Sequence, residues 1–99
     1  MKTVQRIKEL ETFFSGQEGE KCWRHLQEVL PIYGQQGHYK IKPIRSLPNA
    51  YEMRIKKGKG SYRLGFFESE RDYTLFYVSE TLQKVKFDRE AYKVAQSLK

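Results

Sequence analysis

The chain has 99 residues and a net charge of +7, from 19 lysine and arginine side chains against 12 acidic ones. This length suits one domain, residues 1–99, with a single modest core. One cysteine, Cys22, excludes an internal disulfide, and two histidines leave no spacing typical of a zinc site. We expect neither a metal nor another cofactor.

No apolar run approaches the ~20 residues of a membrane span, and no signal peptide precedes the first expected helix. We therefore expect a cytoplasmic protein without a membrane partner.

Two helices are expected at the N-terminus. The first ends at Ser15-Gly16. It carries four apolar residues at helical spacing: Val4, Ile7, Leu10 and Phe14. Ser15 and Glu18 have the form of a capping box for the second helix, which Pro31 closes. The inner face of this second helix is apolar: Cys22, Trp23, Leu26, Val29 and Leu30. We interpret both stripes as core.

A basic connection and a meander of strands follow. Residues 33–50 contain two glycines and two prolines, which predicts an extended connection with room for a short strand near residues 40–44. Alternating apolar and charged residues on both sides of Lys-Gly-Lys-Gly predict a hairpin over residues 51–67. A third strand is expected at residues 73–78. Asp88 is expected as the N-cap of a C-terminal helix.

The hairpin has one register for either turn length. Met53 then lies opposite Leu64 on an apolar face, and Arg54 lies opposite Arg63 on the other face. Like charges directly opposite each other destabilise a sheet, so an anion lying across this face would remove a cost. Solvation of both arginines is the alternative. The third strand places either Phe76 or Tyr77 opposite Arg63, depending on the loop.

These elements predict an α+β fold. Two N-terminal helices would pack on one face of a small antiparallel sheet, a meander of three to four strands, together with a C-terminal helix. The other face of the sheet would carry the arginines.

The net charge lies in one segment, residues 39–63. This segment holds one acidic residue, Glu52, and eight basic ones: Lys40, Lys42, Arg45, Arg54, Lys56, Lys57, Lys59 and Arg63. Three tyrosines are interleaved with them: Tyr39, Tyr51 and Tyr62. Concentrated positive charge beside aromatic rings indicates a polyphosphate partner, most often nucleic acid. An acidic protein or a membrane surface are the alternatives.

Two strands carry a family resemblance. YEMR at residues 51–54 is similar to the Tyr-Glu-Leu-Arg strand of the RelE/HigB superfamily of toxin–antitoxin ribonucleases, and SYRLGFF at residues 61–67 is similar to its Tyr-Arg-Ile-Phe-Tyr strand. The resemblance is to the phage-derived HigB-like branch and covers residues 42–98. Two features depart from the family. Residues 1–3 leave little room for the usual opening strand, and Tyr77-Val78-Ser79-Glu80-Thr81 lacks the Lys-Lys pair of Phe-x-Lys-Lys-Thr.

The resemblance implies a toxin that cleaves mRNA, often on the ribosome, as a metal-independent endoribonuclease. It also implies a cognate antitoxin, expected to be a helix-turn-helix DNA-binding protein. Arg54 and Arg63 would stabilise charge at the scissile phosphate. The candidates for acid and base are Lys56, Tyr77, Lys84 and Lys86, and the candidates for RNA binding are Lys40, Lys42, Arg45, Lys57 and Lys59. His38 also remains a candidate, whereas His25 is a poor one because it lies on the N-terminal helix pair.

Two other functions fit the same pattern. A non-catalytic RNA-binding module, or an inactive RelE-like one, would use the basic face and the aromatic rings without acid–base groups. A basic protein-interaction domain would dock an acidic partner instead.

Overall fold

One mixed sheet and two α-helices make up the fold. The computed structural model describes residues 2–98. Its elements follow in the order β1 (Thr3–Arg6), the 3-10 turn η1 (Lys8–Leu10), α1 (Gly16–Gln36), β2 (Lys42–Pro43), β3 (Ala50–Lys57), β4 (Gly60–Glu68), β5 (Asp72–Ser79) and α2 (Lys84–Ser97). The five strands have the spatial order β1-β5-β4-β3-β2, and all neighbours are antiparallel except β1 and β5. The α+β class is confirmed. Neither described helix is long and apolar enough to cross a membrane.

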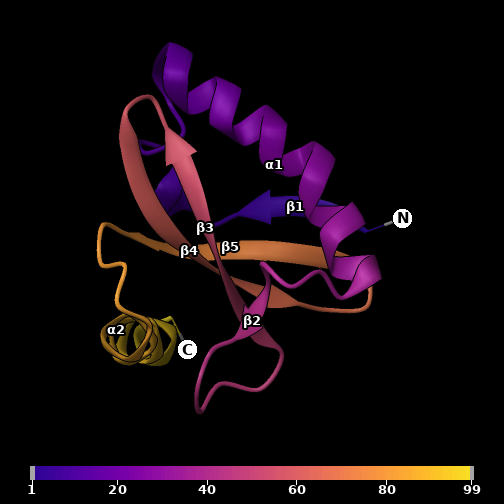
Figure 1. The fold of residues 1–99 in the computed structure, drawn as a ribbon, viewed down its shortest axis with the longest axis vertical. Coiled ribbons are helices and arrows are strands. Elements are labelled where there is room, and N and C mark those ends of the chain that lie inside the picture. Colours follow the sequence, from indigo (N-terminus) through magenta and orange to yellow (C-terminus); the bar gives the residue numbers. More distant parts are fainter. Residues whose placement is uncertain (1, 99) are drawn as a thin grey trace.

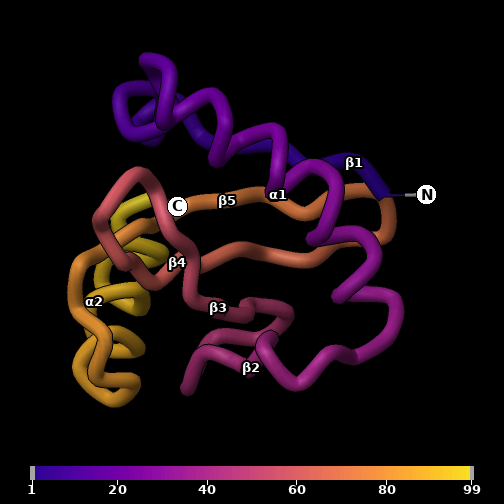
Figure 2. The backbone as a smooth tube through the Cα atoms, turned by 45° about the horizontal axis from the view of Figure 1, so that its top comes forward, coloured from indigo at the N-terminus to yellow at the C-terminus, as the bar shows by residue number. Residues whose placement is uncertain are grey.

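The two helices cover opposite faces of the sheet. Figures 1 and 2 show α1 on one side of the strands and α2 on the other. The α1 side holds the larger core: Val4, Leu10, Phe14, Cys22, Leu26, Leu30, Met53, Ile55, Leu64, Phe66, Tyr73 and Leu75. The α2 side holds a smaller one: Ile44, Ala50, Phe76, Phe87, Ala91 and Ala95. The expectation that the helices share one face is therefore wrong.

The N-terminal segment is a strand, so the expected first helix is wrong. Thr3–Arg6 pairs with β5 in parallel, with Val4 beside Tyr73, and the Ile7 amide donates to the Leu75 carbonyl at 3.0 Å. The chain then passes through η1, where Leu10 is buried. The apolar residues that suggested a helix belong to different elements. Val4 is buried in the strand and Leu10 in the turn, and their spacing resembles that of a helix only in the sequence. The expectation that little room is left for an opening strand is also wrong, because β1 occupies Thr3–Arg6, most of which was assigned to the first helix.

Helix α1 begins after Ser15 as expected, but neither its cap nor its end follows the prediction. The Ser15 hydroxyl donates to the Thr12 carbonyl at 2.6 Å and makes no capping bond. Pro31 does not close the helix, which continues to Gln36. Proline in a helix removes one backbone hydrogen bond and forces a steric adjustment. Pro31 and Leu30 are both buried, and Leu30 belongs to the core on the α1 side of the sheet. Gly37, at φ 62°, ends the helix in the left-handed conformation typical of a C-cap.

The β3–β4 hairpin is confirmed in register. Met53 lies opposite Leu64, and Arg54 lies opposite Arg63. Lys57 pairs with Gly60, so the turn consists of Gly58 and Lys59, and Gly58 adopts φ 59°. Positive φ is common in two-residue hairpin turns, and glycine adopts it without steric cost.

The expected registers of the third strand are both wrong. Arg63 lies opposite Ser79 rather than Phe76 or Tyr77. Strand β4 continues to Glu68. Gly65 pairs with Tyr77, but the next residue, Phe66, pairs with Leu75, so β5 contains a bulge at this point. Phe76 is the extra residue, so Phe76 and Tyr77 both pack toward α2.

Helix α2 begins earlier than expected. It starts at Lys84 after Gln83, so Asp88 is not its N-cap. Asp88 is instead a buried helical residue whose carboxylate accepts from Lys84 Nζ at 2.9 Å and from the Arg45 amide at 3.2 Å. The bond from the Arg45 amide joins α2 to the loop after β2, whereas the bond from Lys84 lies within α2.

Candidate nucleic-acid interface

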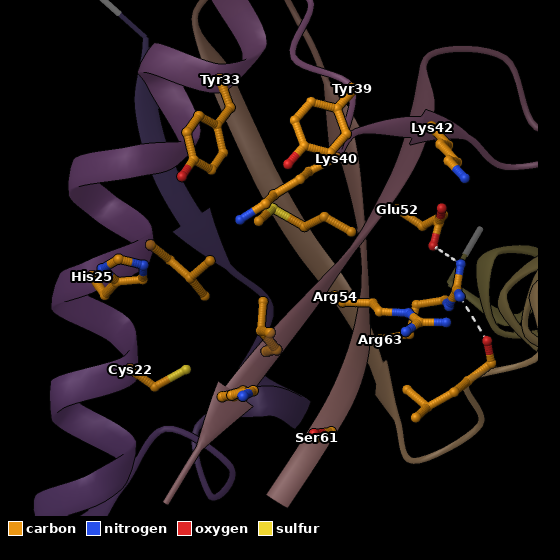
Figure 3. Close-up of a pocket in the computed structure, with 15 residues that line it drawn as sticks. Cys22, His25, Tyr33, Tyr39, Lys40, Lys42, Glu52, Arg54, Ser61 and Arg63 are labelled. Carbon is orange, nitrogen blue, oxygen red and sulfur yellow. Dashed lines mark hydrogen bonds and ion pairs between the residues drawn. The ribbon is translucent and has the colours of Figure 1, made fainter.

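A cleft of about 610 Å³ runs along the outer edge of β3. Strand β2 pairs only with Tyr51 and Glu52, so the edge of β3 from Met53 onward faces this cleft without a strand partner among the described residues. Figure 3 shows α1 with Cys22, His25 and Tyr33 as one wall of the cleft. A volume of this size lies within the range of small-ligand sites.

Four exposed cations from three segments line the cleft. Lys40 comes from the connection after α1, Lys42 from β2, and Arg54 and Lys56 from β3. With Arg63, the lining holds five basic residues against one acidic residue, Glu52. Ion pairs among residues 2–98 involve none of the four exposed cations. Their positive potential is therefore available to an anion from solvent.

Arg63 does not share the environment of Arg54. It is only 6% exposed, its Nη1 forms a buried ion pair with Glu52, and its Nη2 donates to the Leu82 carbonyl at 2.6 Å. Figure 3 shows both bonds as dashed lines. Glu52, 1% exposed, thus removes the repulsion between the two opposed arginines from within the protein. The expectation that an external anion between Arg54 and Arg63 performs this task is wrong.

Tyr77 and Lys84 lie outside the cleft. The Tyr77 hydroxyl donates to Glu90 Oε1 at 3.0 Å, beneath α2. Burial raises the pKa of Tyr77 above its ordinary value of 10.0, the Ser79 hydrogen bond lowers it, and Glu90 raises it further. Lys84 donates to the Pro43 carbonyl at 2.9 Å and pairs with Asp88. Both side chains hold α2 against the sheet and the β2 loop.

The other sequence-predicted residues also separate into two groups. Lys56, Lys40 and Lys42 line the cleft, whereas four others do not: Lys86, Arg45, Lys57 and Lys59. Lys86 and Arg45 are exposed outside the cleft. Lys57 donates to the Phe13 carbonyl at 2.9 Å, and its ammonium lies 3.9 Å from the centre of the Phe13 ring. Lys59 is in the hairpin turn.

His25 is brought to the cleft, contrary to expectation. It lies on α1 in the same wall as Cys22 (Figure 3). The sequence assigned it to a helix pair remote from the basic strands, whereas α1 packs directly against β3. Cys22 is buried as expected, and that burial raises the pKa of its thiol, which Lys57 partly opposes. The signal for His25 was present in its spacing of three residues from Cys22, which places both on one side of a helix.

No cluster of three or more histidine, cysteine or acidic side chains within residues 2–98 is arranged to hold a metal ion. Comparison of the chain with protein-family models, curated proteins and solved structures gave no match.

Proposed function

We propose that the protein is a toxin of the toxin–antitoxin type that binds single-stranded mRNA along β3 and cleaves it as a metal-independent endoribonuclease. The observation that carries this proposal is the convergence of Lys40, Lys42, Arg54 and Lys56 on one cleft. Four exposed cations from three segments match the repeating negative charge of a phosphodiester chain. The two strands that resemble the RelE/HigB superfamily, residues 51–54 and 61–67, form the hairpin beside that cleft.

The proposed reaction begins with the ribose 2′-OH. A base removes its proton, the 2′-oxygen attacks phosphorus, and the 5′-oxygen leaves with a proton from an acid. The products are a 2′,3′-cyclic phosphate and a 5′-hydroxyl. Arg54 suits the phosphorane because a guanidinium holds two phosphate oxygens at once. His25 from α1 and Lys56 from β3, which both line the cleft, are the proton-transfer candidates.

A second function, RNA binding without cleavage, is favoured by one observation. Three of the six catalytic candidates, Tyr77, Lys84 and Lys86, lie outside the cleft, and a fourth, Arg63, is committed to Glu52. The two functions predict the same affinity and differ in the product. A fluorescently labelled RNA incubated with the protein in EDTA separates them. Fragments ending in a cyclic phosphate support the toxin, whereas RNA that stays intact both in this assay and in bacteria that express the protein supports the binding module.

The RNA-binding step is tested by salt. Binding of a labelled single-stranded RNA should weaken steeply from low to physiological salt, with a slope of log K against log salt of about −0.7 for each phosphate contacted. Replacing Lys40 and Lys42 together by alanine should make that slope less negative by about one to two. Alanine at Lys8 and Lys93, both exposed outside the cleft, removes the same charge and should leave the slope unchanged. A flat salt dependence of the parent protein would exclude nucleic acid as the ligand.

The biological role is tested by expression. Expression in bacteria without a partner should arrest growth with loss of intact transcripts, and coexpression of the helix-turn-helix antitoxin should restore growth. We propose that this antitoxin covers the same cleft, and that the ribosome presents the mRNA. Normal growth at confirmed expression would favour the binding module.

A further inference from the structure

Three aromatic rings are stacked at the end of α1, beside the cleft. The Tyr33 and His38 ring centres lie 4.2 Å apart with an angle of 26° between the ring planes. The His38 and Tyr39 rings continue the stack at 4.5 Å and 27°. Such near-parallel rings form one continuous aromatic column that ends at Tyr39.

The column is held by the backbone around it. The His38 amide donates to the Tyr33 carbonyl at 3.0 Å, and the Ile41 amide donates to the His38 carbonyl at 3.0 Å. The Lys40 amide donates to His38 Nδ1 at 3.2 Å, which fixes the plane of the imidazole. These bonds place His38 as a spacer between the two tyrosines. Tyr39 is thereby oriented without being buried.

Folding does not account for the position of Tyr39. This residue is 78% exposed, more than any other large hydrophobic residue among residues 2–98. Tyr51 and Tyr62, the other tyrosines of the basic segment, pack against the core instead. An aromatic ring held in place with one open face is the arrangement that proteins use to stack nucleobases.

The column stands next to the cations of the cleft. The cleft is lined by Tyr33, Tyr39 and Lys40, and Lys40 Nζ lies 5.9 Å from the centre of the Tyr33 ring. Figure 3 shows Tyr33 and Tyr39 at one end of the cleft, with Lys42 near the same end. A nucleotide carries a flat base and a phosphate on one sugar. The column and the lysines therefore offer the two contacts that one nucleotide requires.

We propose that Tyr39, supported by His38 and Tyr33, stacks an unpaired nucleobase while Lys40 and Lys42 bind the adjoining phosphates. The inference rests on the proposed RNA-binding function and adds a subsite to it. It restricts the ligand to single strands, because a base inside a duplex is already stacked on its neighbours. Stacking accepts every base, so this subsite contributes affinity and positioning rather than sequence preference.

The test compares two labelled oligonucleotides of equal length and charge, a single-stranded RNA and its fully abasic analogue. Replacing Tyr39→Leu should weaken RNA binding by about 5- to 150-fold, the range measured for loss of one base–aromatic stack. Binding of the abasic strand should change by less than twofold. Tyr39→Trp should retain RNA binding, and its indole fluorescence should be quenched by RNA and not by the abasic strand. Tyr92→Leu, which removes an exposed tyrosine on α2, is the matched control and should change neither affinity.

Failure of the subsite can be told apart from failure of RNA binding. If the parent binds RNA and the abasic strand equally, or if Tyr39→Leu weakens both equally, the cleft binds phosphates and the stacking subsite is disproved. If the parent binds neither strand, the RNA-binding function is itself disproved, and the subsite with it. Because Tyr39 is exposed, the melting temperature of Tyr39→Leu should match that of the parent, and the affinities can be compared directly.

Discussion

Arg54 and Arg63 lie opposite each other on adjacent strands, yet they occupy different regions of the molecule. Arg54 is exposed on the edge strand and lines the cleft. Arg63 is buried one strand further in, held by Glu52 and the Leu82 carbonyl. Its Nε has no hydrogen-bond partner among the described residues. The difference follows from the strands: β3 has a free edge here, whereas β4 is flanked on both sides and lies under the segment leading to α2.

Cross-strand register alone does not define a site. Register places two side chains on the same face, but depth within the sheet decides whether they meet solvent. A buried guanidinium is costly unless its charge is paired, so Arg63 requires Glu52. An exposed guanidinium on an edge remains available to a ligand. Arg54 is therefore expected to act in function and Arg63 in folding.

Truncation of the buried arginine should have the largest effect. Arg63→Ala leaves the Glu52 carboxylate buried without its partner, so the free energy of unfolding should fall by about 3–5 kcal/mol. Urea denaturation followed by circular dichroism measures this. The double variant Arg63→Ala with Glu52→Gln removes the stranded charge and should be more stable than Arg63→Ala alone. A loss below about 1 kcal/mol, as for exposed pairs, would mean that the two arginines are equivalent after all.

Truncation of the edge arginine should separate activity from stability. Arg54→Ala should reduce RNA cleavage about a hundredfold or more, the effect of losing one preorganised donor at the transition state. The free energy of unfolding should stay within about 0.5 kcal/mol of the parent, as for surface substitutions. Cleavage rates and urea melts are measured on the same preparation. Arg54→Lys keeps the charge without the paired donors and should recover only part of the rate. A variant that cleaves as fast as the parent would remove Arg54 from the site.

The smallest effect concerns the closed side of the sheet at alkaline pH. The folded-state pKa of Tyr77 is raised above 10.0, chiefly by burial. The contribution of the protonated tyrosine to the free energy of unfolding is therefore complete below pH 10. Above that pH the tyrosine loses its proton in the unfolded chain before it does so in the folded protein. The free energy of unfolding therefore falls as the pH rises from the unfolded-state pKa to the higher folded-state pKa. Tyr77→Phe should therefore lose less stability than the parent between pH 9 and about pH 11. Parallel curves for the two proteins would show that Tyr77 titrates alike in both states. Cys22 and Tyr73 also titrate, but they are common to both proteins.

Local sequence patterns predicted the elements whose partners are close in the chain. The β3–β4 register followed from alternation and a glycine turn, because the paired residues are separated by only a few positions. Strand β1 was not predictable in this way, since its partner β5 begins at Asp72 and parallel pairing leaves no local pattern. The bulge at Phe76 was missed because it adds one residue without a composition signal.

The same limit applies to the candidate site. Charge counting along the chain identified a basic segment, and four of its residues line one cleft: Lys40, Lys42, Arg54 and Lys56. It could not reveal that Arg63 is buried, because that depends on Leu82 and α2, far along the chain. Nor could it bring His25 to the cleft, because α1 meets β3 only in the folded molecule.

The parallel pairing of β1 with β5 sets an order of assembly. Thr3 and Asp72 are 69 residues apart, so β1 can dock only after the chain has closed a long loop, whereas the β3–β4 hairpin closes across two residues. The hairpin and its cations can therefore form before β1 joins β5. A chain that ends before Asp72 is thus expected to keep the β3–β4 pairing while β1 stays without its strand partner.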